Sequence, residues 1–302
     1  MKGLVVINGY PRSEKFLRQG ERIANALRTL GVETDVVKNG DIFAVVQADG
    51  STKLNLNGYA FAVYLDKDKY LGRALENEGV CLFNSMKAIE TCDDKTLTSL
   101  ALKGAGVRLA ETIPAPLCYT PNATVNEGFL KNVEKTLGFP MVVKANYGSF
   151  GDGVQLVHGS TELIETAQKL LHVPHCFQRF VSESSGRDIR VVVIGGKAVA
   201  GMERIAKKGE FRSNIELGGE GRTIELTEDV KTVAERTAKA LELDYCGVDL
   251  LEGKDGAIVC EVNSNAFFEG LEKTTGVDIA KEYAKHILAS FPCKYLDKVK
   301  GI

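Results

Sequence analysis

Three oxygen-bearing side chains near the end of the chain could bind a divalent cation: Asp249, Glu261 and Asn263. Residues 248–262 predict two antiparallel strands joined by a turn at Lys254-Asp255-Gly256. Because side chains alternate along a strand, Glu261 and Asn263 point the same way, and the hairpin can place Asp249 beside them. Unpaired carboxylates are costly to bury, and magnesium, which prefers hard oxygen donors, would remove that cost. The same residues also fit two solvated carboxylates at strand ends and an asparagine in a turn, so both interpretations stay open here.

A second candidate site is a lysine followed by a glycine-rich loop. Residues 141–143 predict a strand that delivers Lys144, residues 148–153 read Gly-Ser-Phe-Gly-Asp-Gly, and residues 154–157 predict a returning strand. Glycine backbone can approach phosphates closely, and a lysine supplies the positive charge that phosphates need. A flexible loop with a surface lysine is the alternative.

A third segment places arginines beside acids. Asp188 and Arg190 lie on one face of a predicted strand, and Arg204 and the stretch Phe211-Arg212-Ser213-Asn214 follow in a charged region. This arrangement suits anion binding, although a solvated strand and loop would have the same composition.

The elements before residue 93 alternate between strand and helix, which predicts a parallel sheet wrapped by helices. A helix is expected from Ser13 to Leu30, and residues 291–302 are expected to be peripheral. The first turn lacks G-x-G-x-x-G, and no G-x-x-x-x-G-K-[ST] loop is present. The front part therefore predicts a Rossmann-like module without the usual cofactor site.

Composition excludes several classes of function. The 302 residues include 38 Lys plus Arg and 40 Asp plus Glu, a net charge of −2, so we expect neither nucleic acid nor a membrane as a partner. No window approaches the roughly 20 apolar residues of a membrane span, and the first residues do not resemble a signal peptide. The seven cysteines are scattered without a Cys-x-x-Cys pair, which is typical of reduced thiols. A cytoplasmic location is expected.

The order of these motifs resembles that of the ATP-grasp carboxylate–amine ligases, and most closely the RimK-like α-L-glutamate ligases. The resemblance covers residues 80–290 and rests on Lys95, Lys144, the glycine-rich loop, Asp188-Ile189-Arg190, Arg212-Ser213-Asn214, Asp249 and Glu261-Val262-Asn263. It implies a mixed α/β and α+β chain, an ATP-grasp fold with an N-terminal Rossmann-like pre-ATP-grasp domain. The implied parts are residues 1–93, a lid-bearing subdomain at 94–181 and a metal-binding subdomain at 182–302.

The resemblance also implies roles for individual residues. Asp249 and Glu261 would hold one magnesium ion, and Glu261 and Asn263 a second, with manganese as a substitute. Asp188 would accept hydrogen bonds from the ribose, and the backbone of Arg179-Phe180 would contact adenine. The full implied ATP set is Lys95, Lys144, Gly148, Ser149, Gly151, Gly153, Gln178, Arg179, Phe180, Asp188, Arg212, Ser213 and Asn214. The implied catalytic residues, for the transferred phosphate and the substrate carboxylate, are Arg190, Arg204 and Arg212.

The implied reaction activates a carboxylate as an acyl phosphate, which the amino group of an amino acid then attacks. Magnesium, lysine and arginine would neutralise the repulsion between the two oxyanions that approach each other. L-glutamate is the expected amino acid. The acceptor is a small molecule, a peptide or a protein tail, and a homo-oligomer is expected. A non-catalytic ATP-binding module, and a ligase of the D-alanine–D-alanine or glutathione synthetase type, are the alternatives.

One short stretch departs from the family pattern. Relatives usually carry Pro-Gly shortly after the metal-binding asparagine, where this chain has Ala266-Phe267-Phe268. One hypothesis is that the two aromatic residues reshape the acceptor pocket. The other is that they only pack the loop.

Overall fold

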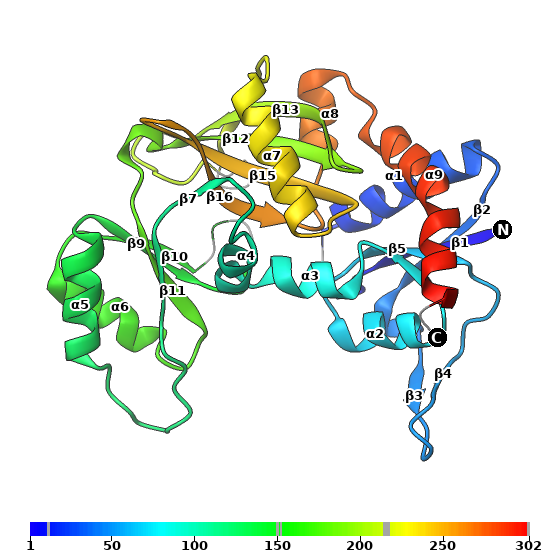
Figure 1. The fold of residues 1–302 in the computed structure, drawn as a ribbon, viewed down its shortest axis with the longest axis horizontal. Helices are drawn as coiled ribbons and strands as arrows, with labels where there is room; N and C mark the ends of the chain where they lie inside the picture. The colour runs from blue at the N-terminus through cyan, green and yellow to red at the C-terminus, as the bar shows by residue number, and fades with distance from the viewer. Residues whose placement is uncertain (11–12, 149–150, 152, 214–217, 301–302) are drawn as a thin grey trace.

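The computed structural model describes residues 1–10, 13–148, 151, 153–213 and 218–300, with side-chain surroundings as far as residue 291. These residues form three large sheets and a two-stranded hairpin (Figure 1). No helix in the described part of the chain is long and apolar enough to cross a membrane.

The front of the chain forms the predicted parallel sheet, and its four strands have the order β2-β1-β5-β6. Its strands are β1 (Lys2–Ile7), β2 (Glu33–Lys38), β5 (Phe61–Leu65) and β6 (Cys81–Phe83). Helices α1 (Lys15–Thr29) and α9 (Ile279–Lys300) cover one face, and α2 (Lys69–Asn77) and α3 (Met86–Asp93) cover the other. A short helix η1 (Asn39–Asp41) and the hairpin β3 (Ala44–Val46) and β4 (Thr52–Leu54), which the sequence analysis missed, complete this part.

One helix prediction needs correction. Helix α1 begins at Lys15, because Ser13 accepts a hydrogen bond from the Lys15 N–H, only two residues on, and Glu14 occupies the cap position. The last residues, which were expected to be peripheral, continue α9 as far as Lys300. Phe291 packs against Phe61 of the front sheet with ring centroids 5.6 Å apart.

The middle of the chain forms a second, antiparallel sheet in the order β10-β9-β11-β8. Its strands are β8 (Thr112–Pro114), β9 (Met141–Ala145), β10 (Val154–Val157) and β11 (His175–Arg179). Helices α5 (Glu127–Leu137) and α6 (Ser160–Lys169) pack on one face through apolar residues that include Val133, Leu163 and Phe177. The predicted hairpin is confirmed, because Lys144 pairs with Val154 across the glycine-rich loop.

The third sheet has the order β14-β13-β12-β15-β16-β7 and is antiparallel except where β16 meets β7. Its strands are β7 (Arg108–Leu109), β12 (Arg187–Ile194), β13 (Lys197–Ile205), β14 (Glu220–Thr223), β15 (Tyr245–Gly253) and β16 (Gly256–Asn263). Helix α7 (Glu228–Ala240) covers one face, while α9 and the short α8 (Glu269–Thr275) lie toward the other. Two further short elements, α4 (Lys95–Ala101) and η2 (Ser182–Ser184), join the sheets.

The predicted hairpin of β15 and β16 is confirmed, with Asp249 opposite Glu261 and Gly253 opposite Gly256. Asn84, just after β6, ties the front sheet to this hairpin. Its side chain donates to the carbonyls of Tyr245 and Ser264 and accepts from the amides of Asp244 and Tyr245, at 2.7 to 3.0 Å. The predicted domain boundaries stay predictions, but α9 packs on the front sheet although it ends the chain.

Candidate active site

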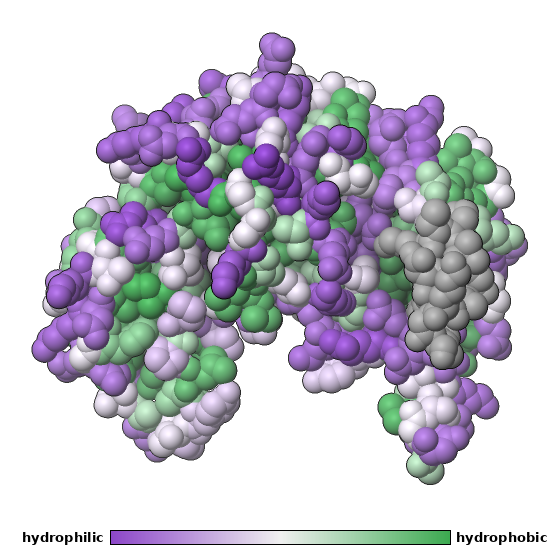
Figure 2. All heavy atoms as spheres, in the orientation of Figure 1, coloured by the Kyte–Doolittle hydropathy of each residue, from purple (hydrophilic) through white to green (hydrophobic). Residues whose placement is uncertain are grey.

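Two cavities meet at the large sheet. The inter-sheet cavity, about 100 Å³, lies between the second and third sheets and is lined from β9, β11, β12, β13, β15 and β16. The front cavity, about 490 Å³, lies between the carboxyl ends of β1 and β5 and the end of β16. Glu261 and Arg204 line both cavities, so ligands in the two cavities would meet at these side chains. On the face shown in Figure 2 the surface is hollowed between the lobe with α5 and α6 and the front domain.

Asp249 is the most enclosed of the three predicted metal ligands, with only 3% of its surface exposed. Arg190 donates a hydrogen bond to each of its carboxylate oxygens, from Nε to Oδ1 and from Nη2 to Oδ2, each at 2.6 Å. Arg204 adds a contact to Oδ2 at 2.8 Å. Burial alone would raise the pKa of Asp249, but the two guanidinium groups outweigh burial and hold the pKa below its usual value. This carboxylate is therefore not the solvated strand end of the alternative interpretation.

Asp188 accepts two hydrogen bonds from Arg204, which lies opposite it on the paired strand β13. One comes from Nε at 2.7 Å and the other from Nη2. Burial raises the pKa of Asp188, with a further increase from the neighbouring Asp249 carboxylate, and Arg204 and Arg190 offset this only in part. The ribose role predicted for Asp188 remains a prediction. In the structure its carboxylate positions Arg204.

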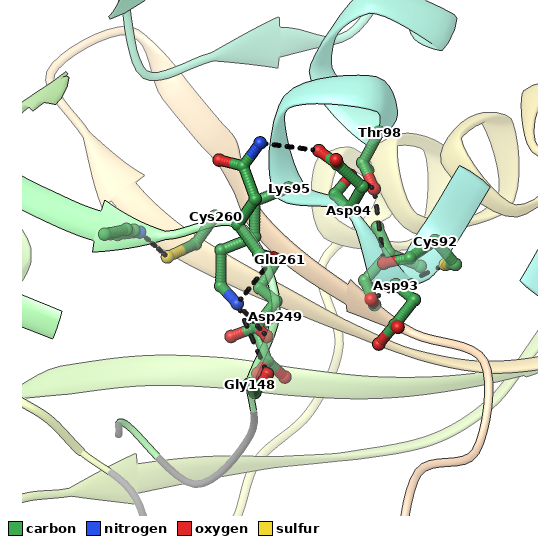
Figure 3. A network of polar contacts seen from close by, with 12 residues as sticks. Cys92, Asp93, Asp94, Lys95, Thr98, Gly148, Asp249, Cys260 and Glu261 are labelled. Carbon is green, nitrogen blue, oxygen red and sulfur yellow. Dashed lines mark hydrogen bonds and ion pairs between the residues drawn. The ribbon is translucent and has the colours of Figure 1, made fainter. Parts of the chain in front are cut away.

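Glu261 and Asn263 both line the front cavity, as their shared strand face predicts. Lys95 at the start of α4 lies 3.6 Å from the Glu261 carboxylate, and its Nζ donates to the carbonyls of Asn146 and Gly148 (Figure 3). Asp94 caps α4 through the amides of Thr96 and Leu97, which fixes the position of Lys95. A predicted phosphate-binding lysine is thus held against the predicted metal ligand.

Lys144 is buried, with 8% of its surface exposed, which excludes the alternative of a surface lysine. Its Nζ lies 3.6 Å from the sulfur of Cys260 on β16. Burial would lower the pKa of Lys144, but Cys260 and Glu261 outweigh burial and the pKa is raised. The ammonium charge is therefore retained inside the inter-sheet cavity.

The glycine-rich loop contacts Arg212, which follows β13 of the third sheet. The carbonyl of Gly151 accepts a hydrogen bond of 2.8 Å from this arginine. Glu210 binds the same guanidinium at 2.8 and 3.0 Å, and this pairing lowers the pKa of Glu210 to about 2. Gly153 and Ser213 belong to the described residues, and Ser213 lines the inter-sheet cavity. The predicted contacts of Ser149 and Asn214 lie outside the described residues.

The predicted adenine contact through the backbone of Arg179-Phe180 stays a prediction. The main-chain N–H of Arg179 donates to the carbonyl of Glu111 at 2.9 Å, so this group is already used by the protein. The Arg179 side chain also turns to Glu111, at 2.6 and 3.0 Å. Gln178 and Phe180 line the inter-sheet cavity, as predicted for residues near a nucleotide base.

The donors present fit magnesium, because Asp249, Glu261 and Asn263 all offer oxygen atoms. Asp249 and Glu261 line the inter-sheet cavity and stand opposite each other in register, while Asn263 lies with Glu261 on the front cavity. No cluster of three or more His, Cys, Asp or Glu residues suited to a metal occurs in the described ranges, and the predicted set has only two residues of these types. Magnesium at Asp249 would share that carboxylate with Arg190 and Arg204.

Sequence reasoning missed the front-domain side of the front cavity. Asn8 and Asp66 follow β1 and β5, and they come together because parallel strands end at one edge of a sheet. The position of two polar residues directly after two strands was the signal that could have found them. The missed lining residues are Asn8, Tyr10, Phe16, Asp66, Lys67, Asp93 and Asn265.

The model of one protein family, described as the RimK-like ATP-grasp domain, matches residues 98–287. This chain belongs to the RimK-like ATP-grasp family. The resemblance stated from the motifs is thereby confirmed. Human N-acetylaspartylglutamate synthase A is 32% identical over 299 residues, which cover 92% of this chain and 74% of that protein.

Human β-citrylglutamate synthase B is 37% identical to this RimK-like chain over 235 residues, which cover 76% of the chain. The matched part spans 59% of that relative's length. The D-alanine–D-alanine ligase of Bacillus anthracis, solved with ATP, superimposes with a TM-score of 0.72 over 99% of both chains at 19% identity. This likeness confirms the ATP-grasp fold.

Proposed function

We propose that this chain is an ATP-dependent ligase that activates a carboxylate as an acyl phosphate and joins it to the amino group of L-glutamate. The main observation that supports this proposal is that Glu261 and Arg204 line both cavities. A triphosphate in the inter-sheet cavity and an acid in the front cavity would then meet at one acidic and one basic side chain.

The chain's own residues supply most of the charge that this reaction needs. Lys95 and Lys144 bring two ammonium groups to the inter-sheet cavity, and Lys95 also holds the backbone of the glycine-rich loop through Gly148. Arg190 is fixed by Asp249 and lines the front cavity, where a guanidinium would stabilise the oxyanion that forms during attack on the acyl phosphate.

Magnesium, held by Asp249, Glu261 and Asn263, would neutralise charge on the phosphate oxygens. A solved ATP-grasp ligase of the same fold, PsnB, contains magnesium and ADP. A second ion between Glu261 and Asn263, replacement by manganese, a homo-oligomeric assembly and a cytoplasmic location remain parts of the proposal.

Two relatives support the choice of substrates. Their names describe products that join glutamate to N-acetylaspartate or to citrate, and both acids are small and carry several carboxylates. The front cavity is lined by three basic residues, Lys67, Arg190 and Arg204, together with the acids Asp66, Asp93 and Glu261. We therefore propose a small polycarboxylic acid as the acceptor and L-glutamate as the amine.

The test is release of ADP from ATP and magnesium in the presence of citrate or N-acetyl-L-aspartate, each with and without L-glutamate, with mass spectrometry of the product. We expect ADP formation that depends on both the acid and glutamate, with an amide product. Absence of ADP with every acid and amine would favour the non-catalytic alternative. Turnover of D-alanine alone would favour the D-alanine–D-alanine ligase alternative.

A further inference from the structure

Asp66 is a buried carboxylate in the wall of the front cavity, with 5% of its surface exposed. Its Oδ1 atom accepts from Asn8 Nδ2 at 3.0 Å and from the Lys67 amide at 2.7 Å. Its Oδ2 atom is fully buried and has no hydrogen-bond partner among the described residues. A buried carboxylate oxygen without a donor is costly, and because the Asp66 side chain lines the cavity, a donating ligand there would offset that cost.

The ion pairs around the front cavity indicate which charge a ligand group beside Asp66 should carry. Lys67 pairs with Asp93, Arg190 with Asp249, and Arg204 with Asp188 and Asp249. Glu261 faces Lys95. Of the charged residues described in the lining of this cavity, Asp66 alone has no partner of opposite charge. Burial raises the pKa of Asp66, and a cationic ligand would stabilise its ionised form.

The surroundings of Asp66 suit an organic ammonium. The aromatic residues Tyr10, Phe16 and Phe267 line the same cavity, and aromatic faces attract ammonium groups, as the Lys15 ammonium 4.6 Å from the Phe267 ring centroid illustrates. The opposite wall carries Arg190, Glu261 and Asn263, where the proposed function places the activated acid.

We propose that Asp66 binds the amino group of the incoming amino acid, through a charge-assisted hydrogen bond from the ammonium to Oδ2, and orients it toward the activated acid. Lys67 and Arg190 also line this cavity, where each is paired with an acid, Asp93 and Asp249. Asp66 would thereby select an amino acid over its deaminated analogue. The choice of L-glutamate rests on the proposed function, whereas the assignment of an ammonium rests on the cavity itself.

The test compares binding of L-glutamate with binding of glutarate, which lacks the amino group, to the full chain by calorimetry. Asp66→Asn keeps an oxygen for Asn8 and the Lys67 amide and replaces Oδ2 with a donor. The matched control is Asp68→Asn, which removes the same charge two residues away. Asp68 caps α2 through the amides of Tyr70 and Leu71, a role that asparagine also fills.

The parent and Asp68→Asn should bind L-glutamate at least about tenfold more tightly than glutarate, as expected for a hydrogen bond to a charged group. Asp66→Asn should bind the two ligands equally, with an unchanged melting temperature. An undiminished preference in Asp66→Asn, or no preference in the parent, would overturn the assignment.

A kinetic experiment separates this inference from the proposed function. Hydroxylamine is a small amine that traps acyl phosphates without needing an amino-acid site. With citrate or N-acetyl-L-aspartate, Asp66→Asn should form hydroxamate at the parent rate while its KM for L-glutamate rises about tenfold or more. A parallel loss of both reactions would indicate a structural role and contradict the inference. Absence of hydroxamate from the parent would contradict the proposed function, while the binding comparison would still decide the role of Asp66.

Discussion

Arg190 on β12 donates two hydrogen bonds of 2.6 Å to Asp249 on the neighbouring strand β15. Their side chains are 14% and 4% exposed, so the pair lies within the protein and not on its surface. Removing one member leaves a buried charge with less compensation.

We expect Arg190→Ala to lower the free energy of unfolding by about 3 kcal/mol, because Arg204 compensates Asp249 only in part. Urea denaturation measures this change. The control is Arg187→Ala on the same strand, whose 2.8 Å pair with Glu252 is about half exposed and should contribute less than about 1 kcal/mol. Equal losses in the two variants would show that the Arg190–Asp249 pair has no special energetic role.

Glu261→Gln should lower kcat about 100-fold or more, because it weakens a ligand at the point where the two cavities meet. Its melting temperature should change little, since the Glu261 side chain is 30% exposed and its contact with Lys95 is 3.6 Å long. ADP release and thermal unfolding are measured together. Glu252→Gln, an exposed change on the neighbouring strand, is the control, and near-normal turnover of Glu261→Gln would refute the metal assignment.

The two aromatic residues that depart from the family pattern separate in the structure. Phe267 lines the front cavity and meets Phe16 edge-to-face at 4.9 Å, while Phe268 is buried against Tyr245. Phe267→Ala should change the ratio of kcat/KM for citrate and N-acetyl-L-aspartate with a stability loss of about 1 kcal/mol. Phe268→Ala should destabilise the fold by about 3 to 5 kcal/mol. An unchanged ratio of kcat/KM for the two acids in Phe267→Ala would indicate that Phe267 only packs the loop.

Asn84→Ala should lower the free energy of unfolding by about 2 to 4 kcal/mol, because buried amides and carbonyls of Asp244, Tyr245 and Ser264 lose their partners. Chemical denaturation measures this loss. Asn55→Ala is a matched control, since Asn55 also bonds the backbone through both side-chain atoms, but at the surface, where water can replace it. A similar small loss in both variants would argue against Asn84 as the link between the front sheet and the β15–β16 hairpin.

His175 should make stability depend on pH. Burial lowers the pKa of His175, so the folded chain binds fewer protons than the unfolded chain as the pH falls through about 6.5. Stability is therefore retained above that pH and lost progressively below it, toward the lowered folded pKa. Denaturation between pH 8 and pH 5 should show a steeper decline in the parent than in His175→Gln. His172→Gln, an exposed change on the same segment, should keep the parent's slope, and an unchanged slope in His175→Gln would contradict the prediction.

Local pattern was sufficient for several features of this protein. Strand alternation and a glycine turn predicted the hairpin that carries Asp249 and Glu261, because the period of a strand is a property of the backbone itself. Lysine, glycine-rich loop and strand in succession predicted the β9–β10 hairpin. The order of the motifs along the chain indicated the family.

Tertiary structure alone decided which partners these residues meet. The register and the order of the strands bring Arg190 and Arg204 to Asp249. Strand alternation specifies neither the register nor the strand order. The front cavity joins segments as distant as Leu65 and Asn265, which are 200 residues apart and share a 2.7 Å hydrogen bond. Packing also leaves Asp66 without an oppositely charged partner among the described residues, and it places Phe267 in the cavity lining and Phe268 in the core. Burial and charge pairing depend on neighbours that no local pattern identifies.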